Sequence, residues 1–179
     1  MSQEITPFIS MEVVGVRIEM PSNQPIVLLK EIDGSRFLPI WVGAAEATAI
    51  AFAQQCINPD RPLTHDLMRD LLQTLDATLL AVQITHIRDG VFFSTLQLRT
   101  HEDAALAISA RPSDAIALAL RSQSNIVASR DLVDEVGIEI PERLIQEMDE
   151  EGQPIEAPSA DLEAFREFLD QINPEDFAG

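Results

Sequence analysis

The chain has 179 residues, 46% of them hydrophobic, with 30 acidic residues, 12 basic residues and one cysteine. This length predicts one domain, or one domain with an appendage, that can bury a hydrophobic core, and a single cysteine excludes an internal disulfide. The N-terminus lacks a secretory signal, and no apolar run approaches the roughly 20 residues that cross a bilayer. We therefore expect a soluble cytoplasmic protein without a membrane segment.

The negative charge is concentrated in the C-terminal part of the chain. Residues 131–179 contain 16 acidic and two basic residues, whereas residues 1–130 contain 14 acidic residues, nine arginines and one lysine. This balance excludes the broad basic surface that usually binds nucleic acid. Because arginine suits bidentate contacts with phosphate or carboxylate, a local anion site remains compatible with the composition.

The first part of the chain is typical of a strand, a hairpin and a helix. Strands are predicted at residues 10–20, 25–32 and 36–42. Asp33 and Gly34 separate the last two runs and favour a tight type I′ turn. The Ala-rich residues 44–56 predict a helix with Glu46 in its first turn, where a carboxylate meets the positive end of the helix dipole.

A second helix is predicted at residues 65–77, after the chain is broken by Asn-Pro-Asp-Arg-Pro at 58–62. Thr64 is expected to be its N-cap. Its apolar residues recur at helical spacing and predict a face that packs on the core. These residues are Leu67, Met68, Leu71, Leu72 and Leu75.

The second half of the chain repeats the order of elements. Strands are predicted at residues 79–88, 91–99, 104–109 and 126–129, and short helices at 131–136 and 141–150. Asp89 and Gly90 again favour a tight turn between strands. Pro112 and Ser113 are typical of a helix start, and Asp114 follows in the first turn.

Residues 38–53 and 106–121 align without a gap and indicate a diverged internal repeat, in which Glu46 matches Asp114. The pattern predicts an α+β fold with a mixed or antiparallel sheet, built from two pseudo-repeated hairpin-strand-helix units with helices packed on it. A site between the two units would face both helix N-termini.

The C-terminal part predicts a separate appendage. We expect a domain over residues 1–149, a linker over 150–160 and an acidic helix over 161–179. Ser159 can cap that helix, and its apolar stripe predicts docking on its own domain or on a sister subunit. The stripe consists of Leu162, Phe165, Phe168, Leu169 and Ile172.

The first candidate site lies where residues 111–114, Arg-Pro-Ser-Asp, lead from a strand into a helix. Free amides at a helix N-terminus bind anions, and Arg111 with Ser113 would add phosphate contacts. The alternative is structural: Ser113 and Asp114 cap the helix while Arg111 pairs with a carboxylate.

The second candidate site covers residues 61–66, Arg-Pro-Leu-Thr-His-Asp. His65 could act as a general base or metal ligand, Asp66 could orient it or bind a divalent ion, and Arg61 could bind phosphate. The alternative is a common helix start in which Asp66 is stabilised by the dipole. Together with Glu46 and Asp114, Asp66 would also complete a carboxylate cluster for Mg²⁺ or Mn²⁺.

Four separated motifs give the chain a family resemblance over about residues 10–140. LPIWVGAAEATAIA, RPLTHDLMRDLL, ITHIRDGVFFSTLQL and SARPSDAIALALR, in this order, resemble the bifunctional nuclease (BFN) domain family. The resemblance implies nuclease activity on RNA and DNA, reported for plant members, and a compact, oligomeric α+β protein. The motif positions in this chain are Glu46, Arg61, Thr64, His65, Asp66, Arg111, Ser113 and Asp114.

The combined expectation is a phosphodiesterase that acts on RNA or DNA, single-stranded in preference to duplex, with Mg²⁺ or Mn²⁺. Glu46, Asp66 and Asp114 would hold the metal, with His65, Asp66 and Asp114 as catalytic residues. Arg61, Arg111 and Ser113 would bind phosphate. The alternative is a homo-oligomeric or regulatory module without catalysis, which explains the acidity because nothing must then bind a polyanion.

Overall fold

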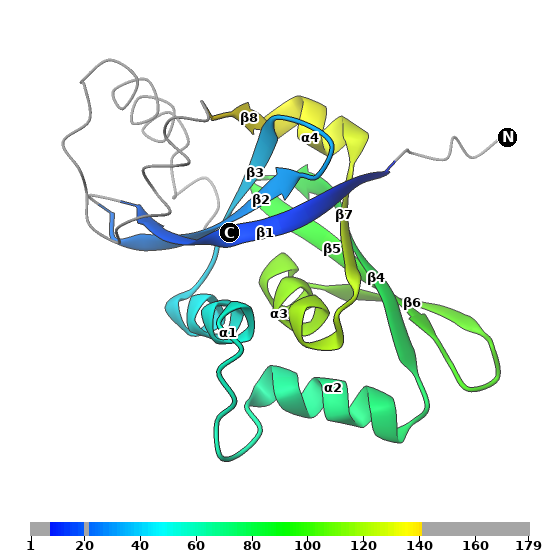
Figure 1. The fold of residues 1–179 in the computed structure, drawn as a ribbon. Coiled ribbons are helices and arrows are strands. Elements are labelled where there is room, and N and C mark those ends of the chain that lie inside the picture. Colours follow the sequence, from blue (N-terminus) through cyan, green and yellow to red (C-terminus); the bar gives the residue numbers. More distant parts are fainter. Residues whose placement is uncertain (1–7, 20–21, 141–179) are drawn as a thin grey trace, which may run out of the picture.

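A mixed β-sheet organises the chain, which we describe from a computed structural model over residues 8–19 and 22–140 (Figure 1). The described residues form an eight-stranded sheet of order β6-β5-β4-β7-β1-β2-β3-β8. The predicted helix at 141–150, linker at 150–160 and helix at 161–179 lie outside these residues. The strands are β1 (Phe8–Glu19), β2 (Gln24–Glu31), β3 (Arg36–Trp41), β4 (Thr78–Arg88), β5 (Val91–Arg99), β6 (Ala105–Ala110), β7 (Asn125–Ser129) and β8 (Ile138–Glu139).

Two three-stranded meanders, β1-β2-β3 and β4-β5-β6, flank the central strand β7. Strand β7 pairs antiparallel with β1 and parallel with β4, so the meanders run in opposite directions on either side of it. The third strand of each meander leads into a helix, α1 (Ala44–Gln54) after β3 and α3 (Pro112–Ser122) after β6. The α+β fold with a mixed sheet is therefore confirmed, and the order of elements follows the repeat seen in the sequence.

Helices α1 and α3, together with α2 (Thr64–Thr74) and α4 (Arg130–Val136), bury apolar side chains in one main core cluster with the sheet. Helix α3 contributes more buried residues to this core than any other helix, from Ala115 to Ala119, and lies between α1 and α2 (Figure 1). None of these four helices is long and apolar enough to cross a membrane.

The two Asp-Gly pairs form different turns. Asp89 and Gly90 have φ values of 50° and 74°, which a type I′ turn requires, so this prediction is confirmed. The type I′ prediction at Asp33 and Gly34 is wrong, because neither residue has a positive φ. The β2–β3 connection is longer and spans residues 32–35, and hairpin loops of four residues are most often built around other turns.

The start and the apolar face of α2 also differ from the prediction. The N-cap is Leu63 and not Thr64, and the Asp66 carboxylate accepts a hydrogen bond from the Leu63 N–H at 2.9 Å. Only part of the apolar face is core: Met68 and Leu72 pack on the main cluster. The other three are exposed although α2 packs against α3 and β4: Leu67 (53%), Leu71 (51%) and Leu75 (69%).

Candidate functional site

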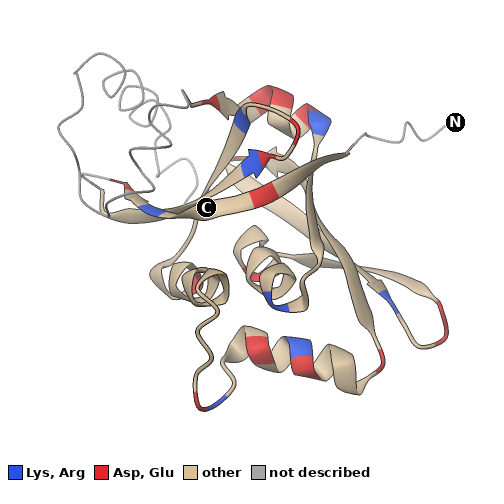
Figure 2. Ribbon diagram, viewed as in Figure 1, with Lys and Arg blue, Asp and Glu red and all other residues tan. Residues whose placement is uncertain are grey.

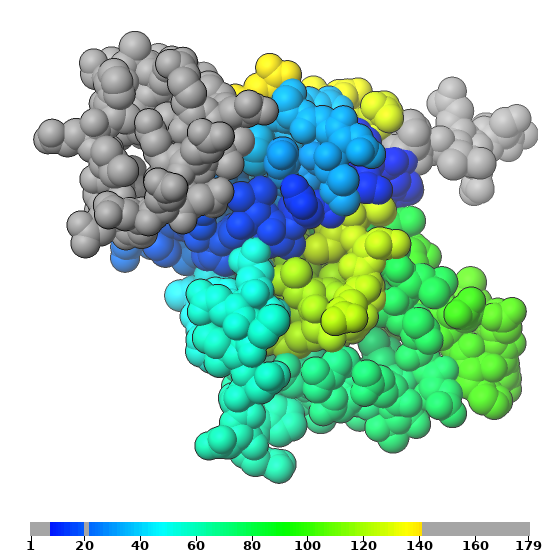
Figure 3. Space-filling view, viewed as in Figure 1, coloured from blue at the N-terminus to red at the C-terminus, as the bar shows by residue number. Residues whose placement is uncertain are grey.

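The N-terminal turns of α1 and α3 carry equivalent acidic residues. Gly43 and Arg111 are the two N-cap residues, both extended and without a side-chain cap, and Glu46 and Asp114 lie in the first turns that follow. The two helices pack against each other, and the surfaces of α1, α2 and α3 adjoin on one side of the molecule (Figure 3). The repeat therefore places two carboxylates beside one another at helix N-termini, where the dipole stabilises negative charge.

One arginine joins these two carboxylates. The Nε and Nη2 of Arg111 donate to Oδ2 and Oδ1 of Asp114 at 2.7 and 3.1 Å, in the bidentate geometry that guanidinium favours. The same Nη2 lies 3.0 Å from Oε1 of Glu46. Arg111 is 66% exposed, whereas Glu46 and Asp114 are 20% and 25% exposed. Arg111 thus pairs with carboxylates, as the structural alternative for residues 111–114 predicted.

Gly43 leaves the space that Glu46 needs to reach Arg111. A Cβ atom at Gly43 would lie 2.4 Å from Oε2 of Glu46, well inside van der Waals contact. The Glu46 side chain therefore folds back over its own helix start. The φ of Gly43 is −70°, so glycine serves here by its size and not by its conformational freedom.

His65 of α2 binds the same carboxylate from a buried position. Its Nε2 lies 3.0 Å from Oδ1 of Asp114, and its side chain is 9% exposed. Its Nδ1 has no hydrogen-bond partner among the described residues. Because those residues include no buried side-chain nitrogen or oxygen without a partner, Nδ1 retains access to solvent. Asp114 is thus the centre of a cluster with Arg111, Glu46 and His65, which we call the Asp114 cluster.

The electrostatics of the Asp114 cluster keep its central carboxyl ionised. Burial raises the pKa of Asp114, but hydrogen bonds from Arg111 and His65 and the Arg111 charge outweigh it and lower the pKa below 3.8. The Asp114 carboxylate in turn raises the pKa of Arg111. A carboxylate that stays charged can orient a neighbouring imidazole and stabilise its protonated form.

Asp66 lies outside this cluster and pairs with a different arginine. Its Oδ1 accepts from Nε of Arg121 at 2.6 Å, and its Oδ2 accepts the Leu63 N–H. Arg121 is 6% exposed and also donates through Nη1 to the carbonyl oxygen of Ala117. Although burial raises the pKa of Asp66, the Leu63 and Arg121 hydrogen bonds lower it below 3.8. Asp66 therefore caps α2 and neutralises a buried arginine.

Arg61 and Ser113, the other two predicted phosphate ligands, lie in different environments. Arg61 is exposed in the connection between α1 and α2 and makes no ion pair with the described residues. Ser113 is 7% exposed inside the first turn of α3. Basic residues are scattered among acidic ones over the described elements and do not gather on one face (Figure 2).

The three predicted metal-binding carboxylates are not arranged as a metal site. Glu46 and Asp114 are brought together, but the Arg111 guanidinium lies between them where a shared cation would have to sit. Asp66 is held by Arg121 instead. Within residues 8–19 and 22–140, no three His, Cys, Asp or Glu side chains are grouped to hold a metal ion. This donor set, as arranged, does not fit a resident Mg²⁺ or Mn²⁺.

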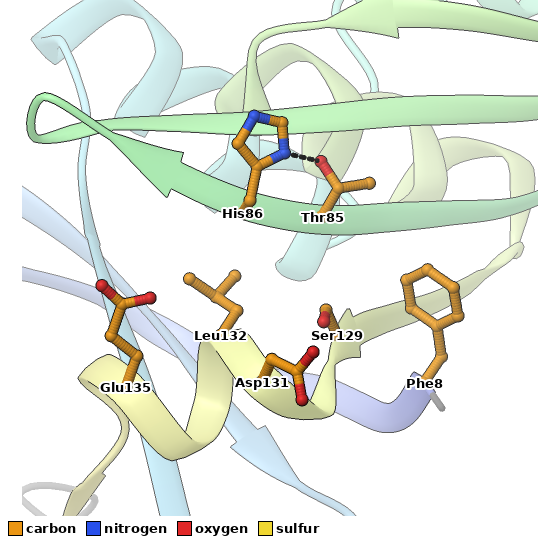
Figure 4. Close-up of a pocket in the computed structure, with 7 residues that line it drawn as sticks. All are labelled: Phe8, Thr85, His86, Ser129, Asp131, Leu132 and Glu135. Atoms are coloured by element: carbon orange, nitrogen blue, oxygen red, sulfur yellow. Dashed lines mark hydrogen bonds between the residues drawn. The ribbon is translucent and has the colours of Figure 1, made fainter. Parts of the chain in front are cut away.

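Sequence reasoning missed Arg121 and a pocket beside His86. Arg121 follows Asp114 by seven residues, which is two helical turns on one face, and this spacing could have indicated a second basic contact. The pocket, of about 550 Å³, lies between β4 and α4 and contains none of the predicted site residues (Figure 4). Beside it, the His86 ring stacks on Phe93 with centroids 4.6 Å apart.

Comparisons with known proteins agree on one family. A family model described as the bifunctional nuclease domain matches residues 27–141. An uncharacterized protein of Mycobacterium tuberculosis is 44% identical over 165 residues, which cover 92% of this chain and 95% of that protein. Bifunctional nuclease 1 of Oryza sativa subsp. japonica and the bifunctional nuclease of Oryza minuta are each 26% identical over 128 residues, 70% of this chain and 39% of theirs.

Proposed function

Because the chain belongs to the bifunctional nuclease domain family, we propose that it hydrolyses phosphodiester bonds of RNA or DNA at the Asp114 cluster. The rice relatives carry the name of this activity, and the matched region contains every residue of the cluster. Hydrolysis needs a group that takes a proton from water and a group that stabilises charge on phosphate. The cluster contains one of each.

The observation that carries the proposal is the contact between Nε2 of His65 and Oδ1 of Asp114 at 3.0 Å. A carboxylate on one ring nitrogen fixes the ring orientation and favours the tautomer in which the other nitrogen accepts a proton. Nδ1 of His65, which no described residue occupies, would then take the proton of the attacking water. Asp114 would stabilise the resulting imidazolium, since its own carboxyl stays ionised.

Arg111 is the proposed phosphate contact. Its Nε and Nη2 are used by Asp114 and Glu46, while Nη1 contacts no described acceptor. Because the side chain is 66% exposed, Nη1 can donate to a phosphate oxygen without breaking the existing pair. Arg61, exposed and unpaired within the described residues, would contact a neighbouring phosphate of a flexible single strand.

Cleavage of fluorescently labelled single-stranded RNA and DNA by the purified full chain tests the proposal. His65→Asn and Asp114→Asn should lower the rate about 100-fold or more, the usual contribution of a positioned general base. Asp134→Asn, which removes an exposed acid paired with Arg36 away from the cluster, should leave the rate unchanged. Equal rates in folded His65→Asn and wild type would refute the proposal and indicate a contaminating nuclease.

Dependence on Mg²⁺ or Mn²⁺ stays a separate prediction, as does a cytoplasmic location. The same assay with EDTA, and with each metal added back, measures the metal requirement. Activity that persists in EDTA would agree with the Arg111-bridged carboxylates, which leave no room for a shared cation. Activity that requires metal would imply that substrate phosphate brings the ion with it or that Arg111 moves.

A second candidate function, a homo-oligomeric module without catalysis, is favoured by a row of exposed leucines that runs along α2 from its N-cap to its C-cap. Leu63, Leu67, Leu71 and Leu75 recur every four residues and are 37%, 53%, 51% and 69% exposed. Large apolar side chains aligned on one helix face are typical of a helix that packs on a partner.

Light scattering on a sizing column distinguishes this candidate from the nuclease. We expect wild type to elute as an oligomer and Leu67→Ser/Leu71→Ser as a smaller species. Leu80→Ser, at an exposed leucine of β4, is the matched control and should not change the mass. A monomeric wild type would refute the oligomeric module, whereas an oligomer without cleavage would refute the nuclease.

A further inference from the structure

The meander β1-β2-β3 has apolar side chains on both of its faces. Val27 and Leu29 of β2 belong to the main core cluster, whereas Ile26 and Leu28, which alternate with them, form a second cluster. Side chains that alternate along a strand point to opposite faces of the sheet. We call the face that carries Ile26 and Leu28 the outer face of the meander.

Strand β3 extends the outer face. Trp41, Pro39 and Phe37 pair directly with Ile26, Leu28 and Lys30, so they share that face. From β1, Val14 packs on the same second cluster. The outer face is therefore a continuous apolar surface across three strands.

This outer face is buried, although a bare sheet face would not be. Ile26 and Leu28 are each 4% exposed, Phe37 is 1% exposed, and Pro39 is buried as well. The corresponding side chains of the other meander behave differently. Gln83, Thr95 and Gln97, which alternate with the buried core residues of β4 and β5, are polar and only half-buried.

The described helices do not supply the cover. Helices α1 to α4 all contribute to the main cluster, and in residues 8–19 and 22–140 the second cluster contains only side chains of β1, β2 and β3. A stable apolar sheet face needs a second layer against it. The outer face therefore needs a layer that the described residues do not supply.

We propose that residues 161–172 form a helix that packs on the outer face of β1-β2-β3 in the same chain. The described chain ends at Ile140, next to β8, and β8 pairs with β3 at this edge of the sheet. The 20 residues from 141 to 160 can span up to about 66 Å, far more than the roughly 15 Å across three neighbouring strands. The segment thus starts beside the face and can reach all of it.

The apolar pattern of the segment matches this surface. Its apolar stripe, from Leu162 to Ile172, has the helical spacing that one buried face requires. Two basic and two acidic side chains lie on the same face, since Arg17 pairs with Ile26, Lys30 with Glu12, and Glu19 with Gln24, so the apolar side chains and not the charge distinguish it. A Cβ placed on Gly15 would lie 2.6 Å from Nη1 of Arg17, so that guanidinium covers the glycine.

Trp41, the single tryptophan of the chain, reports on the outer face. We would measure acrylamide quenching of its fluorescence in the full chain and in Phe165→Asp/Leu169→Asp. The double variant should be quenched several-fold more efficiently and should emit at longer wavelength. Phe177→Asp, in the same tail but outside the stripe, is the matched control and should quench like wild type.

Circular dichroism of each variant shows whether the domain stays folded. Phe165→Ala provides a milder comparison if the double variant unfolds. Unchanged quenching in folded variants would overturn the proposal. If dilution of the wild type makes Trp41 as accessible to acrylamide as in the double variant, the proposal is also overturned, because a second copy and not the same chain would then cover the face. Neither outcome depends on nuclease activity.

Discussion

The ion pair between Asp66 and Arg121 should be one of the strongest single polar contributions to the stability of the domain. Both side chains are mostly buried, at 15% and 6% exposed, and Nε of Arg121 lies 2.6 Å from Oδ1 of Asp66. Breaking a buried pair by removing one partner typically costs about 3–5 kcal/mol, because the other charge stays buried without compensation. Loss of the bond to the Leu63 N–H contributes to the same cost, since a helix cap is worth about 0.5–2 kcal/mol.

We therefore expect Asp66→Ala to lower the free energy of unfolding by about 3–5 kcal/mol, measured by urea denaturation. Asp70→Ala is the matched control. It removes an aspartate from the same helix, but its partner Arg69 is the adjacent residue and both side chains are about one third or more exposed. Such a surface pair should contribute about 0–1 kcal/mol.

The double variant Asp66→Ala/Arg121→Met separates charge burial from packing. It should be more stable than Asp66→Ala alone, because the uncompensated guanidinium is gone while an apolar side chain keeps the volume. If Asp66→Ala costs no more than Asp70→Ala, the buried pair does not stabilise the domain and the reasoning fails. If folded Asp66→Ala loses all cleavage while Asp114→Asn retains it, the catalytic site has been misplaced.

Three further predictions follow from single positions. Because its pKa is lowered, the ionised Asp114 should make wild type more stable than Asp114→Asn above pH 3.8, and this difference should vanish as the pH falls through the lowered pKa. Urea denaturation at a series of pH values measures it. Gly43→Ala should push the Glu46 carboxylate off Arg111 and lower the free energy of unfolding by less than about 1 kcal/mol, because the Glu46 side chain can rotate away. If the double variant Gly43→Ala/Glu46→Ala is less stable than Glu46→Ala alone, this explanation is wrong. Gly90→Ala should cost about 1–2 kcal/mol in thermal unfolding, since a φ of 74° disfavours a side chain, and an unchanged midpoint would contradict the turn assignment.

The elements of the fold were predictable where local chemistry decides the backbone. The Asp89-Gly90 turn, the first-turn positions of Glu46 and Asp114 and the alternation of the strands all depend on residues a few positions apart. The same reasoning failed at Asp33-Gly34, because loop length is set by strand pairing. It also failed for Leu67 and Leu71, because helical spacing marks an apolar face but not what covers it.

Which side chains meet was decided by the tertiary structure. His65 and Asp114 are 49 residues apart, and Asp66 and Arg121 are 55 apart, so their contacts depend on how α2 crosses α3. The residue types alone were as compatible with Glu46, Asp66 and Asp114 around a shared cation as with the observed pairs between these acids and arginines. The amino-acid sequence by itself determined the two acidic helix starts and their equivalence, since propensity and dipole act within one turn. Only the packing of three helices could bring Glu46 to Arg111, which already lies three residues before Asp114, and Asp66 to Arg121. The reason is that such an ion pair forms only where the backbone brings the charges within a few ångströms.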